Sequence, residues 1–238
     1  MNTMQLVLSL FPGIGLLDRA FEEEGFTVVR GPDLLWGGDI KRFHPPSSRF
    51  DGIIGGPPCQ AFSTLRNIGD PVHGNLIPEF ERCIAEAWPQ WFLMENVRGA
   101  PLPFVNGYVV HSVLANNRHF GEIQNRLRRL SFGTISGLAL HLDTQVFEPL
   151  DWAATVTSAH GGDRKTHHNT RTYGKIWRYT VEEACVLQGL PADFFGTRRH
   201  SAERSPFRRE AQLRMIANGV PLPMGRAVAR AVRAAIAQ

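Results

Sequence analysis

Apolar segments that end in glycine, proline or acidic residues recur along the first half of the chain, and they limit the fold more than any other feature. The segment 5–11 (QLVLSLF) predicts a buried strand, and the turn Pro12–Gly15 predicts entry into a helix from Leu16 to about Glu24. A second helix is expected at about 78–87, and further strands are expected at 27–30, 52–55 and 91–94. This alternation predicts a parallel α/β sheet, whose ligands bind at the carboxyl ends of the strands.

The second half of the chain is organised differently. From Thr134 to Lys175 short pieces rich in glycine, threonine and histidine indicate a small irregular subdomain or a set of loops. Regular structure is expected again at 181–188, where Thr180 and Glu183 have the spacing of a capping box, and in a last helix after Pro223. We therefore expect one discontinuous domain made of residues 1–133 and 178–238, with residues 134–177 inserted between its two parts.

Composition narrows the class of protein. A chain of 238 residues with 43% hydrophobic residues can bury a core, which excludes a disordered protein. The net charge of +4 and the pI near 9.3 suit an anionic partner but do not establish nucleic-acid binding. Arginines gather late in the chain, where a solvated surface is the alternative interpretation, at Arg198, Arg199, Arg204, Arg208, Arg209 and Arg214.

Cysteine and histidine usage argues against disulfides and metals. The three cysteines are far apart and lack any C-x-x-C pairing, so a reducing cytoplasm is expected and no zinc site is predicted. The histidines at 160, 167 and 168 lack accompanying ligands at metal spacing. No basic-then-apolar leader is recognised, and no apolar run is long enough to cross a bilayer.

The loops after the first two strands carry residues suited to a nucleotide-like ligand. Gly13 and Gly15 allow a tight turn after the first strand, although Asp18 stands where a dinucleotide fingerprint places its third glycine. Asp33 follows the second strand, where a carboxylate can bind ribose hydroxyls, and Asp39 adds another acidic group. Each feature alone is equally consistent with a plain turn or a capping residue.

The loop after the third strand holds the sharper signal. In the segment 55–60 (GGPPCQ) two prolines stiffen the loop and deliver the thiol of Cys59 toward the predicted ligand crevice. A lone cysteine is usually a small buried hydrophobe, and we expect that packing role for Cys83 and Cys185, which lie in helical patterns. Cys59 is therefore the candidate nucleophile.

Taken together, the motifs resemble those of the cytosine-C5 DNA methyltransferase family, in the order in which the family has them. The resemblance covers the cofactor, nucleophile, target-base, Q-x-R-x-R and two late blocks, at Phe11–Gly15, Pro57–Gln60, Glu95–Val97, Gln124–Arg128, Arg178–Pro191 and Asn218–Pro221. The region from Thr134 to Lys175 lies outside it, where the family places its variable target-recognition region.

The resemblance implies a Rossmann-like S-adenosylmethionine-dependent fold and methylation of cytosine C5 in double-stranded DNA by a monomer. Addition of the Cys59 thiolate at C6 would make C5 nucleophilic, on a base flipped out of the duplex. Glu95 would act at N3, Arg128 near O2, and Arg126 would favour the thiolate. The resemblance assigns cofactor binding to Phe11, Gly13, Gly15, Asp33, Asp39, Pro58 and Asn218. It assigns substrate binding to Gln60, Ser63, Asn96 and Gln124.

The chain also departs from the family pattern. Leu16 and Ala217 replace glycines, and Ile123 replaces a common proline; Ala217 would be strained if its position needs a positive φ. The short region 134–175 indicates brief or relaxed sequence recognition. The alternatives are a tRNA cytosine-C5 methyltransferase, which shares these motifs, and a catalytically silent nucleic-acid-binding relative. The glutamine and arginines of the segment 124–128 could also form one solvated face of alternating residues.

Overall fold

The sheet has six strands, and the first four confirm the predicted parallel arrangement. The computed structural model describes residues 5–58, 74–145, 152–157, 179–196 and 206–237. The strand order is β2-β1-β3-β4-β6-β5, and β1 to β4 run parallel. Their bounds are Leu6–Leu10 for β1, Thr27–Arg30 for β2, Gly52–Gly55 for β3 and Trp91–Asn96 for β4. The predicted strand positions are therefore confirmed, with β4 extending through Glu95 and Asn96.

An antiparallel hairpin that the sequence did not predict completes the sheet. It consists of β5 (Val109–Asn116) and β6 (Leu127–Thr134), and β6 pairs antiparallel with both β5 and β4. The sheet is consequently mixed, because the chain returns along β6 against the direction of β4. This return brings the segment that precedes β6 to the edge of the sheet where β4 ends.

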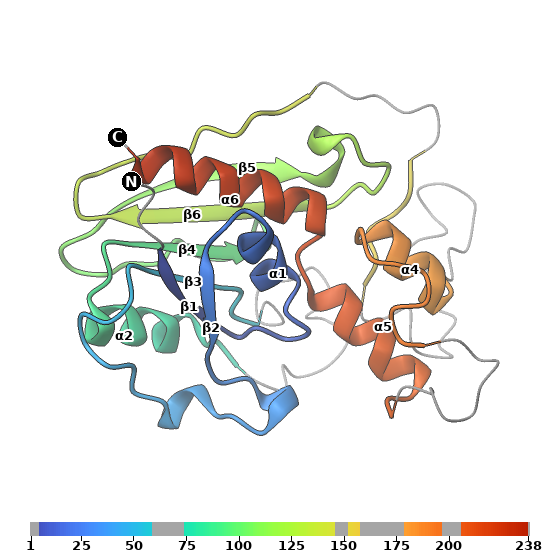
Figure 1. Cartoon of the computed structure of the whole chain (residues 1–238), viewed down its shortest axis with the longest axis horizontal. Coiled ribbons are helices and arrows are strands. Elements are labelled where there is room, and N and C mark those ends of the chain that lie inside the picture. Colours follow the sequence, from blue (N-terminus) through green and yellow to red (C-terminus); the bar gives the residue numbers. More distant parts are fainter. Residues whose placement is uncertain (1–4, 59–73, 146–151, 158–178, 197–205, 238) are drawn as a thin grey trace.

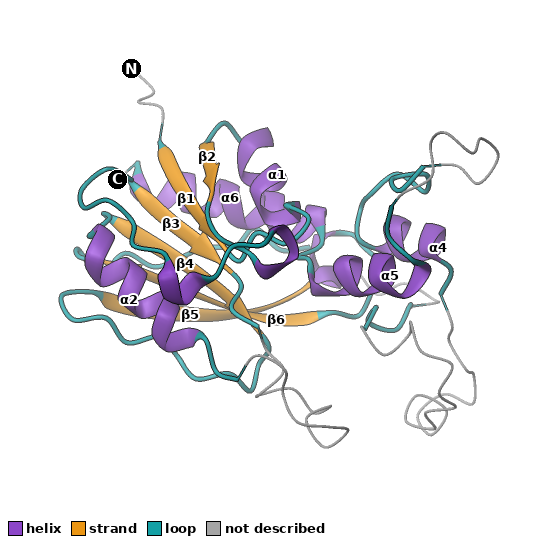
Figure 2. Cartoon of the chain, turned by 90° about the horizontal axis from the view of Figure 1, so that it is seen from below, coloured by secondary structure: helices purple, strands orange, loops and turns teal. Residues whose placement is uncertain are grey.

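Helices cover both faces of the sheet. α1 (Leu16–Glu23) and α6 (Leu222–Ile236) pack on one face, and α2 (Ile77–Ala87) packs on the other (Figure 1, Figure 2). The apolar stripe of α6, which includes Val228 and Val232, is buried in the core between the sheet, α1 and α6. Cys83 lies in a second core, between the sheet and α2, as predicted. α6 therefore shares a core with β1 and α1, while the proposed division of the chain into domains stays a prediction.

Two further helices lie beyond one end of the sheet and share a third core. They are α4 (Val181–Leu187), capped by the predicted pair Thr180 and Glu183, and α5 (Arg209–Asn218), which the sequence analysis did not identify (Figure 1). Cys185 is buried in this core, which confirms its packing role. Ala217 lies inside α5, so its backbone is helical and needs no positive φ.

No helix in the described part of the chain is long and apolar enough to span a bilayer. Within the same residues, no group of three or more histidine, cysteine, aspartate or glutamate side chains could hold a metal ion. The histidines at 160, 167 and 168 lie outside the described residues.

Candidate active site

The turn after β1 has the conformation that its glycines were expected to permit. Gly13 and Gly15 have φ values of 55° and 77°, and the amide of Gly15 donates to the carbonyl of Pro12 at 2.8 Å. Phe11 adopts φ 58°, which is unusual for a residue with a side chain. A Cβ on Gly15 would approach the guanidinium of the exposed Arg30 to 2.7 Å, which that flexible side chain can relieve, so the positive φ is what favours glycine there. The turn follows the end of β1 directly, and the amides of Gly13 and Gly15 donate to Asp33 and to Pro12.

Asp33 ties the loop after β2 to this turn. One carboxylate oxygen accepts the amide of Leu35 at 2.8 Å and so caps the short 3-10 helix η1 (Leu34–Trp36). The other accepts the amide of Gly13 at 2.9 Å, and the indole of Trp36 donates to the Gly13 carbonyl at 2.7 Å. Asp33 is therefore a capping residue in this structure, and it lies beside the proposed cofactor turn. A carboxylate has about four acceptor positions, so these two bonds leave room for a ribose hydroxyl.

Sequence reasoning did not identify the buried carboxylate beneath the turn. Asp18 is 0% exposed; it accepts the hydroxyl of Ser9 at 2.5 Å and pairs with Arg30 at 3.1 Å. Burial raises its pKa, while the bonds from Ser9 and Arg30 act in the opposite direction. The position expected for a third glycine thus carries an anchor that joins β1, α1 and the end of β2.

Glu95 and Arg128 form a nearly buried ion pair at the end of β4. Nε of Arg128 lies 2.9 Å from Oε1 of Glu95, and the two side chains are 13% and 9% exposed. The pairing follows from strand register: Glu95 stands opposite Leu130, so Arg128, two residues earlier on β6, is its diagonal neighbour on the same face. The two proposed catalytic groups are therefore in contact.

The loop that leads to Cys59 passes directly over this pair. A Cβ on Gly56 would stand 3.2 Å from Oε2 of Glu95, so glycine permits the close approach. Asn96 fixes the loop: Nδ2 donates to the carbonyl of Pro57 at 3.2 Å, and Oδ1 accepts the amide of Val97 at 2.8 Å. Asn96 thus holds the loop at Pro57, and its proposed contact with the substrate stays a prediction.

Gln124 and Arg126 are buried, which contradicts the solvated-face alternative. They are 1% and 2% exposed, and Nε2 of Gln124 donates to the carbonyl of Leu187 at 2.6 Å. Arg126 donates to the carbonyls of Val156, Ala217 and Gly219 at 3.2, 2.8 and 3.0 Å. Both side chains therefore bind the returning C-terminal segment. The proposed effect of Arg126 on the thiol stays a prediction.

The remaining predicted residues are placed in part. Pro58 is half-buried at the end of the described loop, and Asn218 is exposed at the end of α5, next to a carbonyl that Arg126 holds. Asp39 caps the 3-10 helix η2 (Ile40–Arg42) by accepting the amide of Lys41 at 3.0 Å. The residues at 59, 60 and 63 lie outside the described residues.

Comparison with known proteins gives a consistent set of relatives. Residues 37–102 match a family model described as C-5 cytosine-specific DNA methylase. The type II methyltransferase M.NgoPII of Neisseria gonorrhoeae is 33% identical over a match covering 53% of this chain and 39% of that protein. The type II methyltransferase M.AquIA of Picosynechococcus sp. is 51% identical over 39% of this chain and 48% of that protein. The chain spans less than half the length of either relative.

Solved structures share the fold. A putative DNA modification methyltransferase encoded within an E. coli prophage superposes with a TM-score of 0.66 at 16% identity, covering 98% of this chain and 100% of that chain. The Entamoeba histolytica methyltransferase EhMeth has a TM-score of 0.64 at 12% identity, covering 94% and 96%. At these identities the likeness concerns the fold alone, and it confirms the predicted Rossmann-like methyltransferase architecture.

Proposed function

We propose that the chain is a member of the cytosine-C5 methyltransferase family and that it transfers a methyl group from S-adenosylmethionine to C5 of cytosine in double-stranded DNA. The observation that carries the proposal is the Glu95–Arg128 pair beneath the Gly56–Pro58 loop, at the carboxyl edge of the sheet. An acid and a cation side by side suit a ring on which negative charge develops. The loop above them leads into Cys59, one residue further on.

The residues at the β1 and β2 ends fit the proposed cofactor. The turn at Gly13 and Gly15 brings backbone close to a ligand without a side chain in the way, and nothing lies within 4 Å of a Cβ built on Gly13. Asp33 and Asp39 offer carboxylates to hydroxyl and amino groups, and Phe11, half-buried, offers a ring face. These residues would hold the cofactor, which supplies an electrophilic methyl group when bound.

In the proposed mechanism each protein group has a separate task. The Cys59 thiolate forms a bond to C6 of a flipped cytosine, and the ring electron pair moves toward N3 and C5. Glu95 donates a proton to N3, and the guanidinium of Arg128 stabilises charge at O2. After methylation the C5 proton leaves to a base or water, the C6–sulfur bond breaks to release the Cys59 thiolate, and N3 returns its proton to Glu95. Asn96 keeps the loop of Cys59 at the sheet edge.

A methyl-transfer assay tests the proposal directly. Purified protein is incubated with tritiated S-adenosylmethionine and either duplex DNA or tRNA, with Cys59→Ser and Cys83→Ser as matched variants. We expect label in DNA, none with Cys59→Ser, and full activity with Cys83→Ser because Cys83 is buried in the core. A duplex containing 5-fluorocytosine should trap the wild type covalently. Label in tRNA alone would establish the RNA substrate instead, and no label in either would favour a silent nucleic-acid-binding relative.

A further inference from the structure

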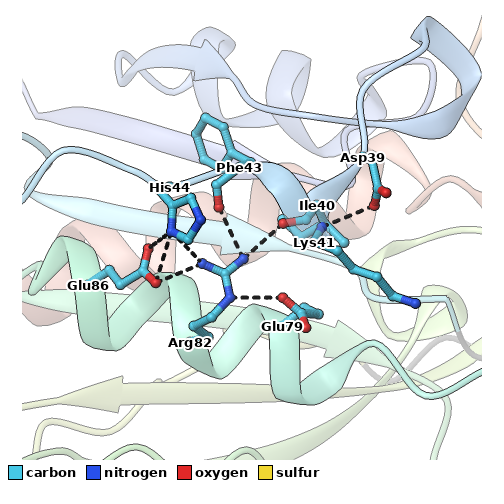
Figure 3. A network of polar contacts seen from close by, with 8 residues as sticks. All are labelled: Asp39, Ile40, Lys41, Phe43, His44, Glu79, Arg82 and Glu86. Carbon is cyan, nitrogen blue, oxygen red and sulfur yellow. Dashed lines mark hydrogen bonds and ion pairs between the residues drawn. The ribbon is translucent and has the colours of Figure 1, made fainter.

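A single arginine on α2 holds both ends of the turn that carries Asp39. Nη2 of Arg82 donates to the carbonyl of Ile40 at 2.8 Å and to the carbonyl of Phe43 at 3.0 Å (Figure 3). Ile40 is the first residue of η2, and Phe43 caps its other end. Asp39 is the N-cap of this same helix. The guanidinium therefore fixes the three-residue helix at both termini, directly after the carboxylate.

The rest of the Arg82 fork is fixed by carboxylates of its own helix. Nε donates to Glu79 at 2.8 Å, and Nη1 donates to Glu86 at 2.8 Å. His44 approaches Glu86 at 3.1 Å and Nη1 of Arg82 at 3.3 Å (Figure 3). Partial burial lowers the pKa of Arg82, but the hydrogen bonds that it donates to Glu86 and Glu79 raise it, and the resulting pKa lies above the ordinary value. Glu79 and Glu86 thus hold Nε and Nη1 of the guanidinium, and Nη2 is directed at the η2 turn.

Among the described residues, the other contacts of this loop include its own backbone bonds, the bond from the Gly38 amide to the Asp33 carbonyl, and the packing of Ile40 and Phe43 in the core around α2. Ile40 is 4% exposed and anchors η2 in the core around α2, whereas its neighbours Lys41 and Arg42 are exposed. A turn of three residues makes few internal bonds, so its orientation depends on outside contacts. Two bonds from one rigid, planar guanidinium define both position and orientation, which a lysine ammonium cannot reproduce while also serving two carboxylates.

We propose that Arg82 is a positioning residue for the cofactor, acting through the η2 turn to hold the Asp39 carboxylate where it meets the adenosine end of S-adenosylmethionine. The inference rests on the proposed function, because it takes Asp39 as a cofactor contact. Among the described residues, Arg82 bonds to Glu79, Glu86, Ile40 and Phe43, and none of these bonds reaches the Asp39 carboxylate itself. Its effect should therefore appear in cofactor affinity and depend on the presence of Asp39.

A double-mutant cycle tests this dependence. S-adenosylhomocysteine is titrated calorimetrically into wild type, Arg82→Lys, Asp39→Ala and the double variant. We expect Arg82→Lys to weaken binding roughly tenfold, as for loss of a hydrogen bond to a charged group, and to weaken it less than about twofold once Asp39 is absent. The matched control is Arg226→Lys, whose side chain pairs with Glu23 at 2.6 Å between α6 and α1; it should bind like wild type.

A second readout follows the turn without any ligand. In Arg82→Lys the Lys41 amide, which donates to Asp39, should exchange its hydrogen faster, while the amides of β1 to β4 keep wild-type protection. Wild-type affinity in Arg82→Lys, or an equal loss with and without Asp39, would overturn the inference and leave the proposed function intact. Failure of the wild type to bind S-adenosylhomocysteine would overturn both, which separates the two failures.

Discussion

Replacement of Arg126 by methionine distinguishes a catalytic arginine from a structural one. Methionine keeps an apolar stem of similar reach but removes the donors that bind the carbonyls of Val156, Ala217 and Gly219. These carbonyls lie in two separate segments, one at Val156 and one at the end of α5, and Arg126 is 2% exposed, so water cannot replace it without rearrangement. If the main role of Arg126 is to hold these segments, the substitution should lower the free energy of unfolding while the folded protein still transfers methyl groups.

The size of the loss follows from the number of bonds. A net contribution of roughly 1–1.5 kcal/mol for each of the three bonds gives a loss of about 3–4 kcal/mol. Part of this is offset, because burying the guanidinium has its own desolvation cost. We therefore expect the free energy of unfolding to fall by about 3 kcal/mol. For a chain of this length, the melting temperature should fall by roughly 6–12 °C.

Urea unfolding followed by tryptophan fluorescence measures this loss. The matched control is Arg230→Met, which removes a surface pair with Glu24 at 2.7 Å and should cost less than about 1 kcal/mol. Below its unfolding transition, Arg126→Met should retain measurable methyl transfer to DNA. An unchanged unfolding free energy together with abolished transfer would refute the structural reasoning and make Arg126 a catalytic cation.

Three further predictions use the thiols, the buried acid and the basic surface. Burial raises the pKa of Cys83 and Cys185 to about 11, so at pH 8 only about one thiolate in a thousand forms, and iodoacetamide should label neither in the folded chain by mass spectrometry. Because unfolded thiols ionise near pH 9, these two groups should lower the free energy of unfolding as pH rises from about 9 to 11, and the slope should flatten in Cys83→Ala/Cys185→Ala. Glu95→Gln should reduce kcat at least about 100-fold while S-adenosylhomocysteine affinity in calorimetry stays unchanged; parallel losses would assign Glu95 to the cofactor. Duplex binding by fluorescence anisotropy should fall steeply with salt, and bisulfite sequencing should show a motif within about four base pairs; a long motif with weak salt dependence would contradict the short recognition region.

Local sequence signals were sufficient for the parallel half of the fold. The strands at β1 to β4 are short apolar runs that end at glycine, proline or acidic residues, and period and turn chemistry act over a few residues. The capping box at Thr180 and Glu183 is equally local and is confirmed. The α5 helix was missed because its buried residues, Leu213 and Met215 to Ala217, are nearly contiguous and do not repeat at helical spacing along the sequence. The bonds from Arg82 of α2 to the carbonyls of Ile40 and Phe43 were missed because the partners are some forty residues apart in the sequence.

The candidate site was predictable in its residue types but not in its contacts. The resemblance placed Glu95 and Arg128 at neighbouring atoms of one base, but it did not indicate that the two side chains pair directly with each other. Asp33 was correctly assigned to a strand end, and its capping bond was one of the open alternatives. Asp18 gave no functional signal, because nothing in its neighbourhood shows that Ser9 and Arg30 would enclose it.

Register decides which of two neighbouring arginines pairs with Glu95: Arg128, the last residue of the Q-x-R-x-R block, or Arg129, which follows it. In the observed pairing Glu95 faces Leu130, and side chains two residues apart on β6 share a face, so Arg128 reaches Glu95. Arg129 points to the other face, where its guanidinium donates to the carbonyl of Ala100 at 2.6 Å. A slip of one residue would exchange these two arginines and turn Arg126 away from the C-terminal segment. The alternating spacing of the block is thus needed by the antiparallel strand, since it keeps a structural and a proposed catalytic guanidinium on one face.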